Sequence, residues 1–133
     1  MTTATNTPSK KMDEFLFEHS IWMKELEFYK NELKIFNKRL LDICGHYKNA
    51  EILARLEQFQ NKFIVHNEVS DILRHDLKKY ENELMEVTKG SVLANEQKIM
   101  LDHPQLRDRM ESFIKIYRQL REDYLRYLAE AMS

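Results

Sequence analysis

The sequence predicts an all-α protein, an elongated antiparallel coiled-coil-like helical bundle of three long helices plus one short helix. An apolar seam with alternating three- and four-residue steps runs from Met12 to Ala131. None of its positions holds Asp, Glu, Lys or Arg, although 32% of the chain is charged. The chain has only two Gly and two Pro, which leaves little material for turns. This pattern is the signature of helices that pack on helices.

The seam falls into three segments. In the first, its positions are Met12, Phe15, His19, Trp22, Leu26, Tyr29, Leu33, Phe36, Leu40, Ile43 and Tyr47. In the second, they are Ile52, Leu56, Phe59, Phe63, His66, Ser70, Leu73, Leu77, Tyr80, Leu84 and Val87. In the third, they are Leu106, Met110, Phe113, Tyr117, Leu120, Tyr124, Tyr127 and Ala131. Each segment is long enough for one helix.

The first long helix is predicted to start near residues 9–12 and to end at Gly45. A Gly directly after a helix readily takes the left-handed conformation that caps the last carbonyls. The polar residues 1–10 are predicted to be a disordered N-terminal tail. Since 133 residues are one domain by size, residues 11–133 are predicted to form a single helical-bundle domain.

The second long helix is predicted to begin after Asn49, a good N-cap residue, with Glu51 placed favourably in its first turn. No Gly or Pro interrupts the sequence from there until Gly90. A helix of roughly 40 residues would be about 60 Å long. Ser91 can then cap a short third helix that runs to about Leu101.

A break or sharp kink is expected at Asp102–His103, because Pro104 disfavours the α conformation of the residue before it. Asp102 would then cap a last helix that runs from Pro104 to about Met132. The seam keeps its phase across this point, at Val92, Ile99, His103 and Leu106, so a kinked continuous helix is the alternative. The connections are short, and sequential helices must therefore run antiparallel.

Composition excludes several classes of protein. The net charge is −1 with both signs mixed along every predicted helix, so we expect no nucleic-acid partner. No apolar run approaches the roughly 18 residues of a membrane span, and the N-terminus lacks the apolar core of a signal peptide. The single cysteine, Cys44, cannot form an internal disulfide, which favours a reducing compartment. We therefore expect a cytoplasmic protein with no membrane contact.

Four seam positions are plainly polar, and three of them are histidines: His19, His66, Ser70 and His103. If the chain folds back about residue 49, position i lies level with 99 minus i. A second fold about residue 90 puts position i level with 180 minus i. His19, Tyr80 and His103 then share one end of the bundle, whereas His66 lies roughly 20 Å away by helical rise. The three histidines therefore cannot form one site.

Two interpretations of the pair His19 and His103 stay open. In the first, each buried His is neutral and bonded to a Tyr or a backbone carbonyl. In the second, the pair forms a metal or ligand site with Asp76 or Glu83 within reach. The Glu-x-x-His pairs of ferritin-like di-iron bundles are absent, because none of the five histidines follows a Glu by three residues.

No motif for covalent or cofactor chemistry is present. The sequence has no Gly-rich phosphate loop, Cys-x-x-Cys pair or nucleophile elbow. Cys44 and His46 flank Gly45, and we interpret them as residues of a helix end rather than as an activated thiol. We therefore expect no catalytic residue, no cofactor and no enzyme activity.

A second apolar stripe lies outside the seam. Ile21, Phe28 and Ile35 repeat at seven-residue spacing in the first helix, and Val65 and Ile72 lie off the seam of the second. The fold-back rule puts these two groups at the same level. A helix in a three-helix bundle buries one stripe, so a second stripe predicts a further helix that covers it. Either the segment 91–101 or a second copy could do so; scattered surface apolar residues are the third interpretation.

We favour the second copy, because closed homodimers are the commonest soluble assembly. The sequence thus predicts a non-enzymatic helical interaction or scaffold protein that acts through coiled-coil-like surfaces. It is expected to be a homodimer, and it could also bind another protein. The alternative is a small metal- or ligand-binding helical bundle that uses His19 and His103.

Overall fold

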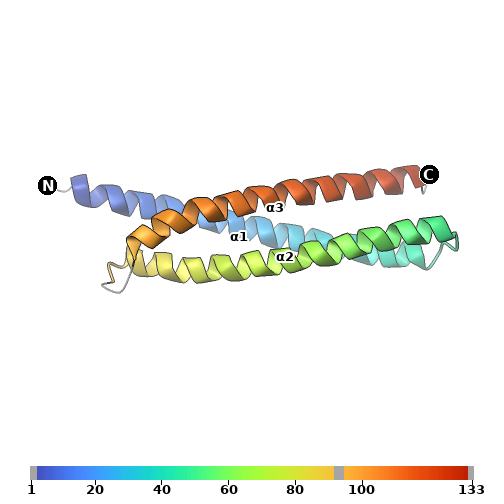
Figure 1. Ribbon diagram of the computed structural model, residues 1–133, viewed down its shortest axis with the longest axis horizontal. Coiled ribbons are helices and arrows are strands. Elements are labelled where there is room, and N and C mark those ends of the chain that lie inside the picture. Colours follow the sequence, from blue (N-terminus) through green and yellow to red (C-terminus); the bar gives the residue numbers. More distant parts are fainter. Residues whose placement is uncertain (1–2, 92–94, 132–133) are drawn as a thin grey trace. The chain divides into compact units, whose positions relative to one another are not determined.

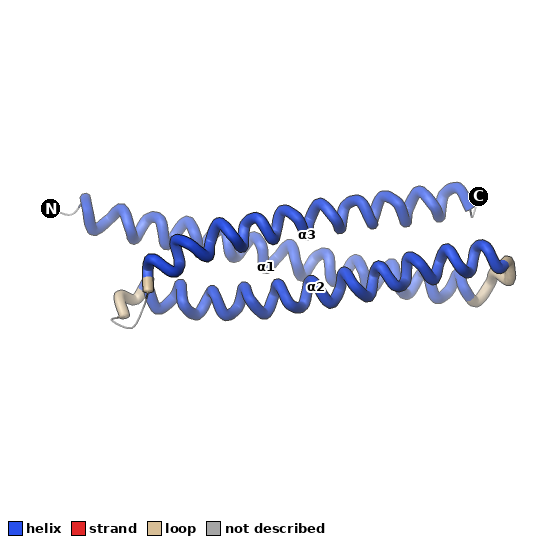
Figure 2. The backbone as a smooth tube through the Cα atoms, in the orientation of Figure 1, coloured by secondary structure: helices blue, strands red, loops and turns tan. Residues whose placement is uncertain are grey.

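The structure is all-α, as the seam predicts. The computed structural model describes residues 3–91 and 95–131, with side chains from Lys10 onward. Its helices are α1 (Thr3–Cys44), α2 (Ala50–Thr88) and α3 (Glu96–Ala131), shown in Figure 1. Figure 2 shows a loop between α1 and α2, and no strand in the described part of the chain. No helix in the described ranges is long and apolar enough to cross a membrane.

Helix α1 begins at Thr3, inside the segment 1–10 that was predicted to be a tail, and ends at Cys44 as predicted. The predicted left-handed cap at Gly45 is wrong, since Gly90 is the one described glycine with a positive φ. Instead, the amides of Gly45 and His46 bond to the carbonyls of Leu41 and Ile43, at 3.2 and 2.9 Å. These backbone bonds satisfy the helix end without a left-handed residue.

Helix α2 is capped as predicted at its start. The amides of Glu51 and Ile52 donate to the Asn49 side-chain oxygen at 2.9 and 3.1 Å. At the other end Gly90 has a φ of 74°. Its amide bonds to the Val87 carbonyl, and that of the next residue bonds to the Glu86 carbonyl, both at 3.0 Å. This pair of bonds is the Schellman motif.

The predicted short helix over 91–101 and the predicted break at Asp102–His103 are wrong, and the continuous helix that was the alternative is present. A single helix, α3, begins at Glu96 and continues through Pro104 to Ala131. Asn95 caps it, with its side-chain oxygen accepting from the Lys98 amide at 3.0 Å. Ser91 precedes this helix, and residues 92–94 lie outside the described ranges. Residues 3–91 and 95–131 therefore form three helices rather than three long helices and a short one.

Tertiary packing explains why α3 continues through Pro104. A proline inside a helix costs about 3 kcal/mol relative to Ala. His103, the residue before it, is fully buried and stacks on Phe15 with 3.7 Å between ring centroids. It also bonds to Tyr80 of α2. These contacts require the helical position of His103, while Pro104 itself is exposed.

The chain divides into two compact units, and each draws on all three helices. Unit 1 comprises Met1–Leu26 and Ile72–Glu111, and unit 2 comprises Glu27–Asp71 and Ser112–Ser133. The seam forms the core of both, since no seam position is exposed. Ile99 and His103, which continue the seam in α3, are also buried. The core of unit 2 is rich in aromatic residues: Phe59, Phe63, Tyr117 and Tyr124.

Within unit 2, the contacts give the direction of the helices. On α1 and α2, Lys30 pairs with Asp71 at 2.7 Å, and Phe36, later in α1, packs against Phe63, earlier in α2. These two segments are therefore antiparallel. Tyr29 packs on Tyr117 of α3, with ring centroids 4.4 Å apart. Phe36 packs on the later Tyr124 of α3, so α1 and α3 run parallel in this unit.

Candidate functional site

The polar centre of unit 1 is His103, which joins three helices. Its Nε2 lies 2.6 Å from Oε1 of Glu18 on α1. Its Nδ1 lies 2.5 Å from the Tyr80 hydroxyl on α2. A carboxylate can only accept, so Nε2 carries the hydrogen and Nδ1 of the neutral ring accepts from Tyr80. Phe15 and Trp22 stack on the ring, with centroids at 3.7 and 4.8 Å.

Arg107 completes this chain of contacts. Its Nε and Nη2 donate to the two oxygens of Glu18 at 3.0 and 2.7 Å, in the two-pronged geometry of strong arginine–carboxylate pairs. Hydrogen bonding to Arg107 is the largest influence on the pKa of Glu18 and lowers it. Glu18 is therefore ionised at neutral pH and holds α1 against α3 in unit 1.

The protonation states make this centre a poor catalytic site. Burial is the largest influence on His103 and lowers its pKa, although Glu18 acts in the opposite direction. Burial also raises the pKa of Tyr80 well above its ordinary value. Both groups are thus neutral near pH 7, and His103 is 0% exposed. The arrangement can order three helices, but it gives a substrate no access to His103.

His19 occupies the neighbouring position in unit 1. Its Nε2 lies 2.9 Å from the carbonyl oxygen of Leu77 and 3.5 Å from the Glu81 carboxylate. A carbonyl can only accept, so Nε2 donates the hydrogen. His19 therefore has the backbone carbonyl partner that the structural interpretation of the sequence predicts for a buried His.

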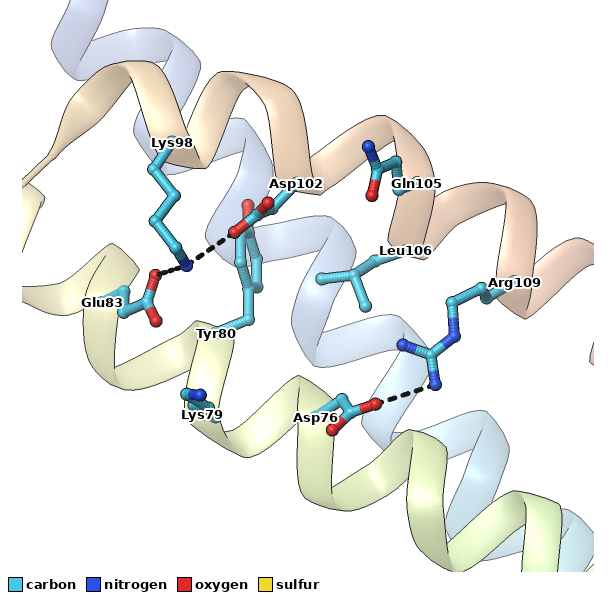
Figure 3. Close-up of a pocket in the computed structure, with 9 residues that line it drawn as sticks. All are labelled: Asp76, Lys79, Tyr80, Glu83, Lys98, Asp102, Gln105, Leu106 and Arg109. Atoms are coloured by element: carbon cyan, nitrogen blue, oxygen red, sulfur yellow. Dashed lines mark hydrogen bonds and ion pairs between the residues drawn. The ribbon is translucent and has the colours of Figure 1, made fainter.

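The two carboxylates predicted to lie beside these histidines are paired with cations instead. Asp76 bonds to Arg109 at 2.9 Å, and Lys98 bonds to Glu83 at 2.5 Å and to Asp102 at 2.9 Å (Figure 3). Burial alone would raise the pKa of Asp76, but the hydrogen bond and the charge of Arg109 outweigh it, and the pKa is lowered. These ion pairs line a surface pocket of about 190 Å³ in unit 1.

The proposed metal set is not assembled as a ligand cluster. His19, His103, Asp76 and Glu83 all lie in unit 1, yet each has a different partner. In the described ranges, no three His, Cys, Asp or Glu side chains are grouped so that they could hold a metal ion. The geometry instead shows satisfied polar contacts between helices.

Sequence reasoning missed Glu18 and Arg107, the two charged residues of the centre. A signal for them was available. The two fold-back rules together put position 22 of the first helix level with position 103, and Trp22 does stack on His103. Glu18 lies one helical turn before Trp22, on the same side of α1, and so within reach of His103 and Arg107.

Unit 2 contains a counterpart of this centre, two heptads away along each helix. Glu32 accepts hydrogen bonds from the Tyr117 hydroxyl and from Nε of Arg121, the latter at 2.9 Å. His66 of α2 stacks on Phe113 and Tyr117, with centroids at 4.3 and 5.3 Å. His66 and Tyr117 thus exchange the places of the tyrosine and the histidine of unit 1.

His66 differs from His103 in having an unsatisfied nitrogen. Its Nε2 is buried and has no hydrogen-bond partner. Burial lowers the pKa of His66 to about 4, so the ring is neutral near pH 7. Protonation would put a charge in an aromatic environment without an acceptor, which costs free energy. His66 is therefore a structural histidine whose charge state is coupled to folding.

The residues predicted to form an interface are on the surface. The exposed fractions are 39% for Ile21, 59% for Phe28, 66% for Ile35, 58% for Val65 and 60% for Ile72. Each follows a seam residue by two positions, which is about 200° around the helix. Each of these side chains therefore points away from the core of its own unit. We call the outward faces that carry them the back of α1 and the back of α2.

The remaining sequence candidates are Cys44 and His46 at the end of α1. Cys44 is a partly buried free cysteine. Nδ1 of His46 lies 2.7 Å from the Asp42 carbonyl oxygen, so it donates to the last turn of the helix. This bond supports the structural interpretation, because a donor near the helix C-terminus satisfies a free carbonyl.

No family model matches the chain, and comparisons with curated proteins and with solved structures give no match either.

Proposed function

We propose that this chain is a non-enzymatic helical interaction or scaffold protein, and that it acts as a homodimer through coiled-coil-like surfaces. The observation that carries the proposal is the back of α1, where Phe28 and Ile35 are 59% and 66% exposed. Large apolar residues that recur at heptad spacing on one outer stripe favour a covering partner. A second copy brings the same stripe and is the simplest such partner.

The contacts inside each unit support the finer fold proposal, an antiparallel coiled-coil-like bundle. In unit 2, the contacts Lys30–Asp71 and Phe36–Phe63 together support an antiparallel arrangement of α1 and α2. In unit 1 the contact of His19 with Leu77 agrees with the same fold-back rule. In both units a carboxylate of α1 bonds to side chains of α3, since Glu18 bonds to His103 and Arg107, and Glu32 bonds to Tyr117 and Arg121.

The outer residues of α1 and α2 offer two stripes rather than one. In unit 2, Phe28 and Ile35 point outward from α1, and Val65 points outward from α2. Each of these side chains is more than half exposed and points away from the core of unit 2. The homodimer proposal therefore assigns the main contact to α1, where the stripe contains an aromatic residue.

Light scattering at micromolar concentration tests the proposal. Wild-type protein is expected at twice the 16.1 kDa chain mass. Phe28→Glu or Ile35→Glu should lower the mass toward one chain while circular dichroism shows unchanged helix content. Ile116→Glu is the matched control, because Ile116 is 60% exposed on α3 and lies off the stripe. A monomeric wild type would contradict the proposal.

A further inference from the structure

Unit 2 has a groove between α1 and α2 that no other part of the described chain fills. Its walls are Lys30, Lys34 and Asn37 of α1, and Phe63, Ile64 and Asn67 of α2, with Leu33 also lining it. Its volume is about 170 Å³. Sites for small molecules usually enclose about 300 to 1,000 Å³. The groove is therefore too small for a typical small ligand, but it can accept a side chain from a partner.

The groove combines an apolar base with an exposed apolar edge. Leu33 is 4% exposed and Phe63 is 3% exposed, and both belong to the aromatic core of unit 2. Ile64, at the edge, is 50% exposed. A groove of this kind between two helices is the surface on which a further amphipathic helix packs, because its apolar residues reach the base.

The charge of the groove is one-sided. Two lysines and two amide side chains line it, and no carboxylate does so. Lys30 is paired with Asp71 at 2.7 Å, but Lys34 is exposed and has no ion-pair partner within the described residues. A complementary partner therefore presents carboxylates to this side of α1.

Asn37 adds a second observation at the same place. It lines the groove, and its Oδ1 is buried without a hydrogen-bond partner. A buried polar atom without a partner costs free energy. A partner with hydroxyl or amide donors would satisfy this oxygen if the Asn37 side chain turned into the groove. The groove is therefore lined by one polar side chain, Asn37, whose oxygen has no hydrogen-bond partner within the described chain.

We propose that this groove binds an acidic amphipathic helix of a partner protein. The apolar residues of that helix pack on Phe63 and Ile64, and its flanking carboxylates face Lys34. The inference rests on the proposed interaction function and adds the chemistry of the partner. It uses the groove between α1 and α2, whereas the homodimer uses the back of α1, so the two can fail separately.

Fluorescence anisotropy with a designed probe tests the inference. The probe is a synthetic three-heptad peptide with Leu along one face and Glu on both flanks. The matched peptide has Lys in place of each Glu. Wild-type protein should bind the Glu peptide about tenfold more tightly than the Lys peptide, because a correct charge pair at a rim commonly has an effect of this order. Equal binding of the two peptides would overturn the inference.

Variants locate the binding surface. Lys34→Glu should weaken binding of the Glu peptide about tenfold, and Ile64→Asp should abolish it. The matched controls are Lys115→Glu and Ile116→Asp, at exposed positions of α3 in unit 2. Circular dichroism shows which variants remain folded. An equal loss for Lys34→Glu and Lys115→Glu would reduce the effect to net charge and overturn the inference.

The same variants separate a partner helix from a second copy. Light scattering of Lys34→Glu and Ile64→Asp without peptide should give the wild-type mass. If either variant turned a dimer into a monomer, the groove would be occupied by another copy of this chain. That result would overturn the partner-helix inference and leave the homodimer proposal in place. A monomeric wild type that binds the Glu peptide would contradict the homodimer proposal and support the partner-helix inference.

Discussion

Glu32 makes the same kind of contacts to α3 that Glu18 makes two heptads earlier in α1. Each carboxylate accepts one hydrogen bond from a histidine or tyrosine side chain of α3 and another from the arginine one turn later in that helix. The donors are His103 and Arg107 for Glu18, and Tyr117 and Arg121 for Glu32. Charge-assisted bonds of this kind are among the stronger hydrogen bonds in proteins. Each unit therefore has its own polar connection between α1 and α3.

Replacing Glu18 with Gln should destabilise the protein by about 1 to 3 kcal/mol, because the amide offers one acceptor oxygen where the carboxylate has two. The amide nitrogen would also face the donors of His103 or Arg107. Urea unfolding measures the change. Glu14→Gln is the matched control, since Glu14 is an exposed residue of the same helix. Equal unfolding midpoints for the two variants would show that the Glu18 contacts contribute nothing to stability.

His66 should make stability depend on pH. Burial lowers the folded pKa of His66 to about 4 from its ordinary value of 6.5. The unfolded state therefore binds the proton first as pH falls. The His66 contribution is complete above about pH 6.5 and is lost as pH falls toward 4. From the size of the pKa shift, the loss is on the order of 3 kcal/mol.

His66→Phe isolates this effect, because the replacement keeps a ring and removes the basic nitrogens. Urea midpoints of both proteins are measured between pH 4.5 and 7.5. Carboxylates and the other histidines titrate in both proteins, so their effects largely cancel in the difference. The wild type should lose stability relative to the variant as pH falls. A difference that stays constant across this range would mean that His66 does not titrate as its burial requires.

Pro104→Ala should stabilise the protein by about 1 to 3 kcal/mol. In α3 the position is inside a continuous helix, where Pro lacks the amide that would bond to the carbonyl four residues earlier. If Pro104 were instead the first residue of a separate helix, the change would be neutral or slightly unfavourable. Thermal melts of the two proteins decide between these cases by the sign of the change.

Leu33→Asp and Leu73→Asp should each unfold the protein or cost several kcal/mol. These residues are 4% and 2% exposed, and an unpaired charge at a buried position is very unfavourable. The control is Ile116→Asp, at a position that is 60% exposed and lies outside the proposed dimer interface. Circular dichroism melts give the comparison. If Leu33→Asp melted within a few degrees of the wild type, the predicted heptad register would be wrong in unit 2.

Much of the local structure was predictable, because it depends on neighbouring residues. Asn49 caps α2 through bonds to residues two and three positions later. Gly90 ends the same helix because a left-handed φ is easy for glycine. The seam also predicted the buried positions correctly, since the requirement for apolar contact repeats with every turn of the helix.

The errors and omissions involve contacts between distant parts of the chain. The rule that Pro disfavours a helical residue before it is local, and it failed at His103 because α1 and α2 hold that residue in place. Glu18 was not among the sequence candidates, because it lies beside the seam rather than in it. Its role appears only when α1 is placed beside α3, which pairs residues far apart in sequence.

The missing amide of Pro104 also has a consequence for the motions of α3. The carbonyl of Met100 lacks its usual helical donor, so opening this turn breaks fewer hydrogen bonds than opening any neighbouring turn. Transient local unfolding within α3 should therefore be easier at residues 100–104, the turn that carries His103, than in the neighbouring turns. Amides in this turn would exchange with solvent sooner than those near Tyr117, even though both segments belong to one uninterrupted helix.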